Sequence, residues 1–275
     1  MLYRGMDRAA LDAAYNNRAA VPAATELIAG WNERSAALRR RRSGHIDLHY
    51  GEGPRERLDL FLADDPNAPT LAYIHGGYWQ MNDKEGYSFL AEGTLPHGVN
   101  LAVVEYTLAP EARLDRIVAE IRRAVLWLDE HLGDFGADPK RLYVSGHSAG
   151  GHLTAMAMTL PAVRGGIAIS GLYDLEPIRL NYLNEKLGLD IAEARRNSPL
   201  FHLPAMAGEL VIAYGTGELP ELCRQSVDYA QAWVERGLPG QLLPIDGADH
   251  FTILEALAAP NGELTAALLA MIRKG

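Results

Sequence analysis

The chain has 275 residues, of which 48% are hydrophobic and 22% charged, a composition typical of an ordinary globular protein with enough apolar residues for a large core. The formal net charge of −9 argues against a nucleic-acid partner, because phosphate binding needs a basic surface. The single cysteine, Cys223, excludes an intrachain disulfide, and the lack of an apolar N-terminal segment or of about 18 consecutive apolar residues predicts a cytoplasmic protein without a membrane partner.

The first predicted elements are helical. Residues 7–42 carry apolar side chains at helical spacing on both sides of Pro22, which predicts two helices that precede any strand and form an N-terminal extension. The run Tyr15-Asn16-Asn17-Arg18 is unusual inside a helix, because asparagine side chains compete with the helical backbone for hydrogen bonds. This run is interpreted either as a helix terminus or as part of a cap that lends polar groups to a substrate.

The rest of the chain reads as strands that alternate with helices. Period-two patterns at 45–50 and 57–62 predict an antiparallel hairpin. Six apolar runs predict further strands at 70–74, 100–105, 141–145, 165–170, 209–214 and 240–245. Helices are predicted at 86–92, 111–132, 151–160, 220–236 and 252–273. This order implies an α/β fold with a mostly parallel sheet of eight strands covered on both faces, in one domain that spans residues 1–275, with the extension at 1–44 and the core at 45–275.

A glycine-rich loop follows the strand at 70–74 directly. In His75-Gly76-Gly77-Tyr78-Trp79, two glycines let the backbone approach a ligand and point N–H groups into a cavity. In an acyl-transfer enzyme such a cavity is the oxyanion hole, whose second donor is the residue after the nucleophile, here Ala149. The alternative is a plain glycine turn. His75 is expected to brace the loop and not to act as a base.

The segment Gly146-His147-Ser148-Ala149-Gly150 matches G-x-S-x-G and lies between the predicted strand at 141–145 and a helix. Strand, tight turn and helix are the context in which this motif presents a nucleophilic serine. We expect a strained backbone at Ser148, with flanking glycines because side chains there would collide. The alternative is a glycine-rich turn in which the serine caps the helix.

A serine nucleophile needs a base and an acid that orients the base. His250 lies after the last predicted strand and before the last helix, where the base of such a fold is expected. Glu218 follows the strand at 209–214 and is the favoured acid. The alternatives left open are Asp246, Asp249, Asp228 and Glu221.

These motifs carry a family resemblance that extends over most of the chain. The chain resembles the α/β-hydrolases, in particular the kynurenine formamidase (arylformamidase) branch and its bacterial esterase relatives near the hormone-sensitive lipase group. The resemblance is carried by the G-x-S-x-G turn at 146–150, called the elbow below, by the loop His75-Gly-Gly-Tyr-Trp79 and by the segment Ser170-Gly-Leu-Tyr-Asp-Leu175. The sequence H-G-G-x-W looks like the formamidase branch and differs from the H-G-G-G of the lipase group. The N-terminal helices also look like the extension of that branch.

The resemblance implies an α/β-hydrolase fold and a set of site residues. It implies Ser148 as nucleophile, Glu218 as acid, His250 as base, and an oxyanion hole from the backbone of Gly76, Gly77, Tyr78 and Ala149. The chain departs from the family at 218, where aspartate is usual. The resemblance further implies a small-molecule substrate such as N-formylkynurenine, cleaved to formate and the aryl amine, although bacterial relatives include general carboxylesterases. A ligand-binding homologue without activity is a remote alternative.

Substrate-binding residues are proposed from position alone. Tyr78 and Trp79 beside the oxyanion hole, with Tyr15 and Asn16 from the extension, are expected to wall a pocket with little acyl room. The alternative for the aromatic residues is ordinary packing. No metal or organic cofactor is expected, because no Cys/His cluster of ligand spacing and no phosphate loop is present. The oligomeric state stays open, with a homodimer as one candidate.

Overall fold

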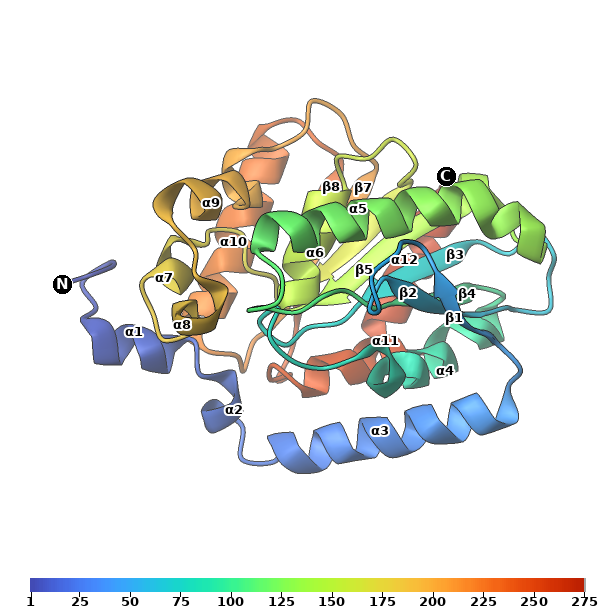
Figure 1. Cartoon of the computed structure of the whole chain (residues 1–275), viewed down its shortest axis with the longest axis horizontal. Helices are drawn as coiled ribbons and strands as arrows, with labels where there is room; N and C mark the ends of the chain where they lie inside the picture. Colours follow the sequence, from blue (N-terminus) through green and yellow to red (C-terminus); the bar gives the residue numbers. More distant parts are fainter. Residues whose placement is uncertain (275) are drawn as a thin grey trace.

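The computed structural model describes residues 1–274, which are built around one twisted sheet of eight strands (Figure 1). The strands are β1 (His45–His49), β2 (Arg57–Phe61), β3 (Thr70–Ile74), β4 (Asn100–Val104), β5 (Leu142–His147), β6 (Gly165–Ile169), β7 (Glu209–Gly215) and β8 (Gly240–Ile245). Their order in the sheet is β1-β2-β4-β3-β5-β6-β7-β8. The pairs β1–β2 and β2–β4 are antiparallel and the other pairs are parallel, so the predicted mostly parallel sheet is confirmed.

Helices cover both faces of the sheet, because alternate side chains of the buried strands point to opposite sides. Ala72 and Ile74 of β3 pack into one core cluster, whereas Leu71 and Tyr73 pack into the other. The first cluster is closed by α5 (Leu114–His131), α6 (Ala149–Ala157) and α10 (Pro220–Glu235). The second is closed by α4 (Ala91–Thr94), α11 (Glu255–Ala258) and α12 (Glu263–Lys274).

The N-terminal extension is present but has three helices, not the two that were predicted. They are α1 (Arg8–Ala14), α2 (Asn17–Ala20) and α3 (Ala24–Arg41). The additional break falls at Asn16, whose side-chain oxygen accepts the N–H of Ala19 at 3.2 Å and so caps α2. The interpretation of the asparagine run as a helix terminus is therefore confirmed.

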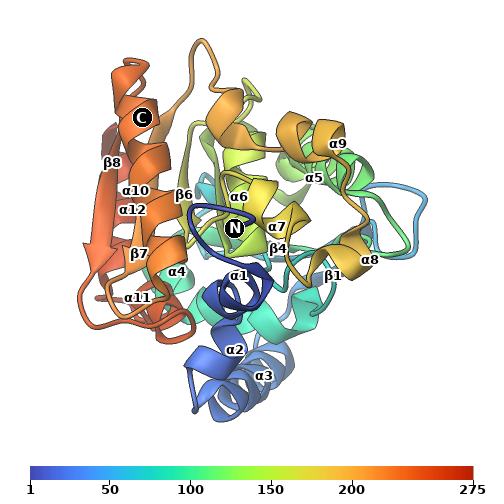
Figure 2. The ribbon, with the colours of Figure 1, turned by 90° about the vertical axis from the view of Figure 1, so that its left-hand side faces the viewer.

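The long helix α3 lies outside the second face of the sheet, with α4 and α11 between them (Figure 1, Figure 2). It packs on the 3₁₀ segment η1 (Lys84–Leu90), where the ring of Trp31 stacks on that of Phe89 with centroids 5.5 Å apart. Arg34 of α3 forms ion pairs with Glu92 at 2.8 Å and with Glu255 at 2.9 Å. These contacts fix the extension to the core at 45–274.

Two predictions about helices were wrong. The segment between β6 and β7, for which no helix was predicted, contains α7 (Glu176–Arg179), α8 (Asn184–Leu187) and α9 (Ile191–Arg196), each too short to show a helical period. The helix predicted at 252–273 is divided into η6 (Thr252–Leu254), α11 and α12. Pro260 lies at the division, and a Cβ at Gly262 would lie 2.2 Å from the carbonyl oxygen of Ala256, so the chain turns where a straight helix was expected.

The remaining short 3₁₀ segments are η2 (Leu95–His97), η3 (Leu132–Phe135), η4 (Pro139–Arg141) and η5 (Pro199–Phe201). The helix α1 lies beside α7 and α8 in both views (Figure 1, Figure 2), and the carboxylate of Asp12 accepts the N–H of Tyr182 at 2.8 Å. The extension thus meets the segment between β6 and β7 near the carboxyl edge of the sheet.

Candidate active site

Ser148 lies at the sharp turn between β5 and α6. Its backbone has φ 58° and ψ −118°, a strained conformation for a residue with a side chain. A Cβ at Gly146 would lie 2.4 Å from the carbonyl oxygen of Gly150, and a Cβ at Gly150 would lie 2.0 Å from that of Ile74, so both positions require glycine. The Ser148 side chain makes no capping hydrogen bond within the described part of the chain, which contradicts the capping-serine alternative.

The structure brings His250 and Glu218 together from loops that follow adjacent strands. The Nδ1–H of His250 donates to Oε2 of Glu218 at 2.6 Å, and both side chains are buried. Because Nδ1 carries the proton that bonds the carboxylate, Nε2 of His250 is left free to accept a proton. His250 lines the same cavity as Ser148. A histidine that is oriented by a carboxylate and lies beside a serine is what a serine nucleophile needs.

The alternative acids have other partners. Asp228 and Glu221 bind the guanidinium of Arg224 at 2.6 and 2.8 Å, and Asp249 accepts the backbone N–H of Phe251 at 2.8 Å. Asp246 accepts the hydroxyl of Thr216 at 3.3 Å. Glu218 is the candidate acid whose carboxylate contacts His250.

Ser170 is a site residue that sequence reasoning missed. It follows β6 with φ 51°, and its hydroxyl donates to Oε1 of Glu218 at 2.5 Å. The N–H of Gly215 donates to the same oxygen at 2.7 Å. These two donors turn Oε2 toward His250. In the sequence, Ser170 could have been identified only from its position at the end of a strand, within the segment 170–175 that resembles the formamidase branch.

The glycine loop after β3 lies directly against the elbow. A Cβ at Gly76 would lie 3.1 Å from Cβ of Ser148 and 2.7 Å from the carbonyl oxygen of His147. Gly77 has φ 112°, and Tyr78 has φ 51°. Within residues 1–274, the backbone N–H groups of Gly77, Tyr78 and Ala149 donate to no protein acceptor. Free donors beside a nucleophile are what an oxyanion hole needs.

Ser148 and His250 open into a cavity of about 430 Å³. Its wall combines the glycine loop, the extension and the segment around α8. The lining residues are Asn16, Asn17, Arg18, Ile28, Trp31, Gly77, Tyr78, Gln80, Met81, Asn82, Tyr87, His147, Ser148, Tyr182, Leu183, Glu185, Lys186, His250 and Phe251. The extension therefore closes one side of the cavity.

Tyr78 joins the cap to the oxyanion loop. Its hydroxyl donates to the carbonyl oxygen of Tyr15 at 2.6 Å and accepts from Nδ2 of Asn17 at 3.0 Å. Burial raises the pKa of Tyr78 well above its ordinary value, so the hydroxyl stays protonated. The ring is thereby held as a rigid wall of the cavity.

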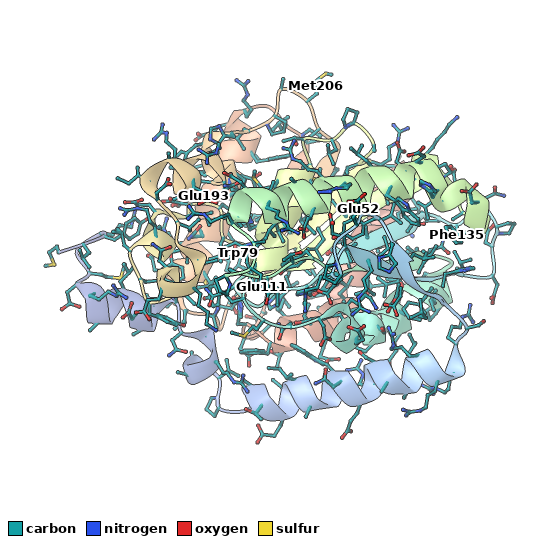
Figure 3. The ribbon with its side chains drawn as sticks, viewed as in Figure 1. Glu52, Trp79, Glu111, Phe135, Glu193 and Met206 are labelled. Atoms are coloured by element: carbon teal, nitrogen blue, oxygen red, sulfur yellow. The ribbon has the colours of Figure 1, made fainter. Side chains whose placement is uncertain are left out.

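Two residues predicted to bind substrate do not line this cavity. Trp79, labelled in Figure 3, is fully buried and packs edge-on against His152 with ring centroids 5.0 Å apart. Tyr15 is also fully buried, and its hydroxyl accepts from Gln225 at 3.0 Å and donates to Glu221 at 3.2 Å. For Trp79, the alternative of ordinary packing is correct, because left-handed φ values at both Tyr78 and Trp79 reorient the chain so that adjacent side chains reach different environments.

Two buried histidines next to the elbow stay neutral. Burial, with a further contribution from His250, lowers the pKa of His147 well below its ordinary value. Burial lowers the pKa of His152 to about 4, against a smaller opposing effect of its hydrogen bond to the carbonyl oxygen of Asn197 at 2.7 Å. His147 therefore does not compete with His250 for the proton of Ser148.

The lowered pKa of His152 predicts a loss of stability in acid. Below about pH 6.5 the unfolded chain binds a proton at His152, whereas the folded chain binds it only near pH 4. The free energy of unfolding therefore falls as the pH is lowered through this window. Between pH 7 and pH 4 we expect the free energy of unfolding to fall by about 3 kcal/mol more for the wild type than for His152→Gln. Urea unfolding at both pH values measures this difference, and equal losses in the two proteins would refute the assignment.

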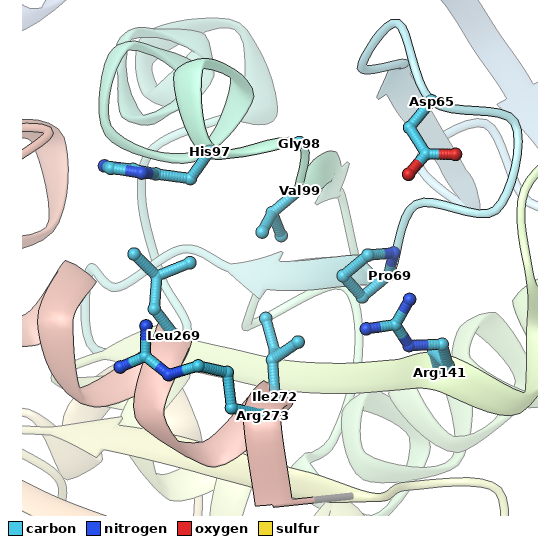
Figure 4. A pocket seen from close by; sticks show the side chains of 9 residues that line it. All are labelled: Asp65, Pro69, His97, Gly98, Val99, Arg141, Leu269, Ile272 and Arg273. Atoms are coloured by element: carbon cyan, nitrogen blue, oxygen red, sulfur yellow. The ribbon is translucent and has the colours of Figure 1, made fainter.

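A second cavity, of about 320 Å³, lies at the opposite edge of the sheet (Figure 4). Pro69, Val99 and Arg141 in its wall immediately precede β3, β4 and β5. Ligands of open α/β sheets bind at the carboxyl ends of the strands, and this cavity has no serine or cysteine in its lining. The cavity at Ser148 is therefore the candidate active site.

Residues 1–274 contain no group of three or more His, Cys, Asp or Glu residues that could hold a metal ion. No helix in that range has both the length and the apolar character needed to span a bilayer.

The sheet order, the strained serine elbow and the paired histidine and glutamate define the chain as a hydrolase of the α/β-hydrolase class. A family model described as BD-FAE matches residues 58–168. The kynurenine formamidases of Danio rerio and Salmo salar are each 34% identical to the chain, over 83% of its length and 82% of theirs. The chain belongs to the kynurenine formamidase family.

Solved structures share the fold of this chain. A structure from Silicibacter sp. TM1040, provisionally assigned as a thioesterase, is 30% identical, with a TM-score of 0.83 over 94% of this chain and 98% of that one. An esterase of Pyrobaculum calidifontis has a TM-score of 0.71 at 20% identity, over 93% of this chain and 94% of its own, which shows the shared fold. The α/β-hydrolase fold predicted from the motifs is confirmed.

Proposed function

We propose that the chain hydrolyses N-aryl formamides such as N-formylkynurenine, and short-chain aryl esters, through a triad of Ser148, His250 and Glu218. The observation that carries this proposal is the 2.6 Å contact between Glu218 and His250 beside the cavity into which Ser148 opens. The names of the relatives supply the substrate class, and the lining of the cavity supports it.

The proposed reaction has two acyl-transfer steps. His250 takes the hydroxyl proton of Ser148 as the oxygen attacks the formyl carbon, and the free N–H groups of Gly77, Tyr78 and Ala149 stabilise the oxyanion. His250 then gives its proton to the departing nitrogen, and the C–N bond breaks to leave a formyl-enzyme. Water attacks this ester by the same route and releases formate. Glu218 holds the imidazole in the required tautomer throughout.

A small acyl group suits the space next to the serine. The glycine loop approaches Ser148 so closely that a Cβ at Gly76 would lie 3.1 Å from its Cβ, and Tyr78 is fixed by two hydrogen bonds. A rigid wall close to the nucleophile discriminates against longer acyl chains by steric exclusion. Formyl and acetyl groups are therefore the proposed acyl portions.

The other part of the cavity suits an aromatic leaving group with a carboxylate. Trp31, Tyr87 and Phe251 offer aromatic faces. Arg18 and Lys186 line the same cavity, as does Glu185, whose carboxylate pairs with Arg8 at 3.5 Å. In the part of the chain that the structure describes, Arg18 and Lys186 themselves have no acidic partner, and Arg18 donates to the hydroxyl of Thr25 at 3.4 Å. On a protein with net charge −9, two unpaired cations at this cavity attract an anionic substrate that the rest of the surface repels.

Turnover of N-formylkynurenine, neutral formanilide and p-nitrophenyl esters of increasing chain length tests the proposal. We expect kcat/KM to be highest for the formyl-aryl amides and to fall as the ester chain lengthens. Higher kcat/KM for butyryl esters than for any formamide would indicate a general short-chain carboxylesterase. Absence of turnover together with failure of a fluorophosphonate probe to label Ser148 would indicate a binding protein on this fold.

The two cations give a sharper prediction. We expect the double variant Arg18→Gln/Lys186→Gln to raise KM for N-formylkynurenine roughly tenfold and to leave KM for formanilide unchanged, since a charge-assisted contact contributes about 1.5 kcal/mol. Lys140→Gln, a change of an exposed lysine remote from the cavity, is the matched control. An equal change in KM for both substrates would rule out carboxylate recognition by these residues.

For location and assembly we propose a cytoplasmic enzyme that uses no cofactor and binds no nucleic acid, with a homodimer as the candidate assembly. The single cysteine and the net charge support the first part of this proposal. Light scattering of the purified chain tests the second.

A further inference from the structure

The methionine side chains differ widely in their contact with water. Within residues 1–274, Met1, Met81 and Met206 are 95%, 46% and 87% exposed, whereas Met158 and Met271 are 1% and 3% exposed. An oxidant dissolved in water reaches an exposed thioether and is kept from a buried one. Among the exposed methionines of this range, Met81 is the one that lines the candidate active-site cavity.

Met81 belongs to the turn that follows the glycine loop, and it packs on that loop. The backbone N–H groups of Gln80 and Met81 donate to the carbonyl oxygen of Gly77 at 2.9 and 3.2 Å. A Cβ at Gly77 would lie 2.9 Å from Cγ of Met81, so the side chain of Met81 starts against the backbone of Gly77. The N–H of Gly77 is one of the donors proposed for the oxyanion. The sulfur of Met81, which is bonded to Cγ, is therefore close to the reacting part of the cavity.

The thiol of the chain is shielded from the same chemistry. Cys223 is partly buried and does not line the cavity, and burial raises the pKa of its thiol. The thiolate is the reactive form of cysteine, so this shift slows oxidation at Cys223. In the part of the chain that the structure describes, Met81 is thus the sulfur-containing residue in the cavity wall.

Oxidation changes this part of the wall from apolar to polar. Hydrogen peroxide transfers one oxygen atom to the sulfur of Met81. The O–O bond breaks, an S=O bond forms, the sulfur is oxidised by two electrons, and the peroxide leaves as water. The sulfoxide oxygen is a hydrogen-bond acceptor that water solvates in the empty cavity. An aryl substrate that fills the cavity removes this water and offers no donor in its place, which weakens binding.

We propose that Met81 is a modification site at which peroxides convert the thioether to a sulfoxide and thereby lower turnover of aryl substrates. The change is reversible, because a methionine sulfoxide reductase, supplied with a thiol reductant, removes the oxygen as water. The inference rests on the proposed function of Ser148 and its cavity. It adds to that function a dependence of activity on the redox state of the surroundings.

Peroxide treatment of the full chain, followed by peptide mass mapping and kinetics with neutral formanilide, tests the proposal. When Met81 is fully converted to the sulfoxide, we expect kcat/KM of the wild type to fall roughly tenfold. Treatment with methionine sulfoxide reductase should restore the original value. Met81→Leu cannot form a sulfoxide at this position, so its kcat/KM should stay within about twofold of its own value before treatment.

Met206→Leu is the matched control. Met206, labelled in Figure 3, lies on the loop between η5 and β7, is more exposed than Met81 and does not line the cavity. This variant should have wild-type activity before treatment and should lose as much activity in peroxide as the wild type. Met81→Gln places a polar side chain at the same position without an oxidant, and we expect it to lower kcat/KM for formanilide, whereas Met206→Gln should not.

Two results would overturn the proposal. One is an equal loss of activity in the wild type and in Met81→Leu, which would place the damage at another residue such as Cys223. The other is unchanged kinetics of a wild-type enzyme in which mass mapping finds Met81 fully oxidised. If the untreated enzyme hydrolyses neither formamides nor esters, the proposed function fails before any oxidation, so the two failures are distinguishable.

Discussion

We expect Ser148→Ala to lower kcat for formyl-aryl amides and for p-nitrophenyl acetate by about 10⁴-fold or more, since loss of a triad nucleophile leaves only binding and the oxyanion hole. Protein stability should be unchanged, because the Ser148 side chain makes no capping hydrogen bond and alanine keeps the Cβ at the same backbone position. The measurement is steady-state kinetics together with mass spectrometry after fluorophosphonate treatment. The wild type should gain one adduct on Ser148, and the variant none.

Ser145→Ala is the matched control. Ser145 lies three residues earlier on β5, is fully buried, and donates to the carbonyl oxygen of Ile167 at 2.9 Å. Its loss should cost about 1 kcal/mol of stability and leave kcat unchanged. Ser148→Ala with more than a tenth of wild-type activity, or an adduct at another residue, would show that Ser148 is not the nucleophile.

The second large effect concerns the acid. We expect Glu218→Gln to lower kcat by about 10⁴-fold, because an amide at this position no longer stabilises the imidazolium and no longer selects the tautomer with Nδ1–H. Glu218→Asp keeps the charge but shortens the side chain, so we expect a smaller loss of roughly 10²-fold from misplacement of His250. Steady-state kinetics of the two variants beside the wild type measure both losses.

Glu221→Gln distinguishes this result from a general sensitivity to lost carboxylates in the same region. Glu221 was an alternative acid, but its carboxylate binds Arg224 at 2.8 Å and accepts from Tyr15 at 3.2 Å. Its kcat should remain within twofold of wild type. A loss in Glu221→Gln as large as that in Glu218→Gln would contradict the assignment of the acid.

Ser170 explains how a glutamate replaces the usual aspartate here. The longer side chain has one more rotatable bond, and the donors Ser170 and Gly215 hold one carboxylate oxygen so that the other reaches His250 at 2.6 Å. Sequence reasoning favoured the acid from its position after a strand. The groups that orient it come from β6 and β7, two neighbours in the sheet that lie about 45 residues apart along the chain.

The strands and the elbow were predictable because they depend on local properties of the chain. Apolar runs such as 70–74 are typical of strands that are buried on both faces, whatever their position in the sheet. The G-x-S-x-G turn requires glycine because the backbone of β3 lies against it. The cap was only half predictable. Asn16 interrupts a helix by a local capping bond, whereas its position in the cavity wall depends on how the extension packs.

The position of Trp79 in the sequence did not predict where its side chain lies. It adjoins Tyr78 in the sequence, yet Tyr78 lines the cavity and Trp79 packs on His152. The sequence by itself determined the fold class, the serine nucleophile as a candidate and the order of the triad, since each depends on short-range pattern and on chain order. Only the tertiary structure decided which acid meets His250 and which side chains wall the cavity, because these contacts join segments that are distant in the chain and adjacent only after folding.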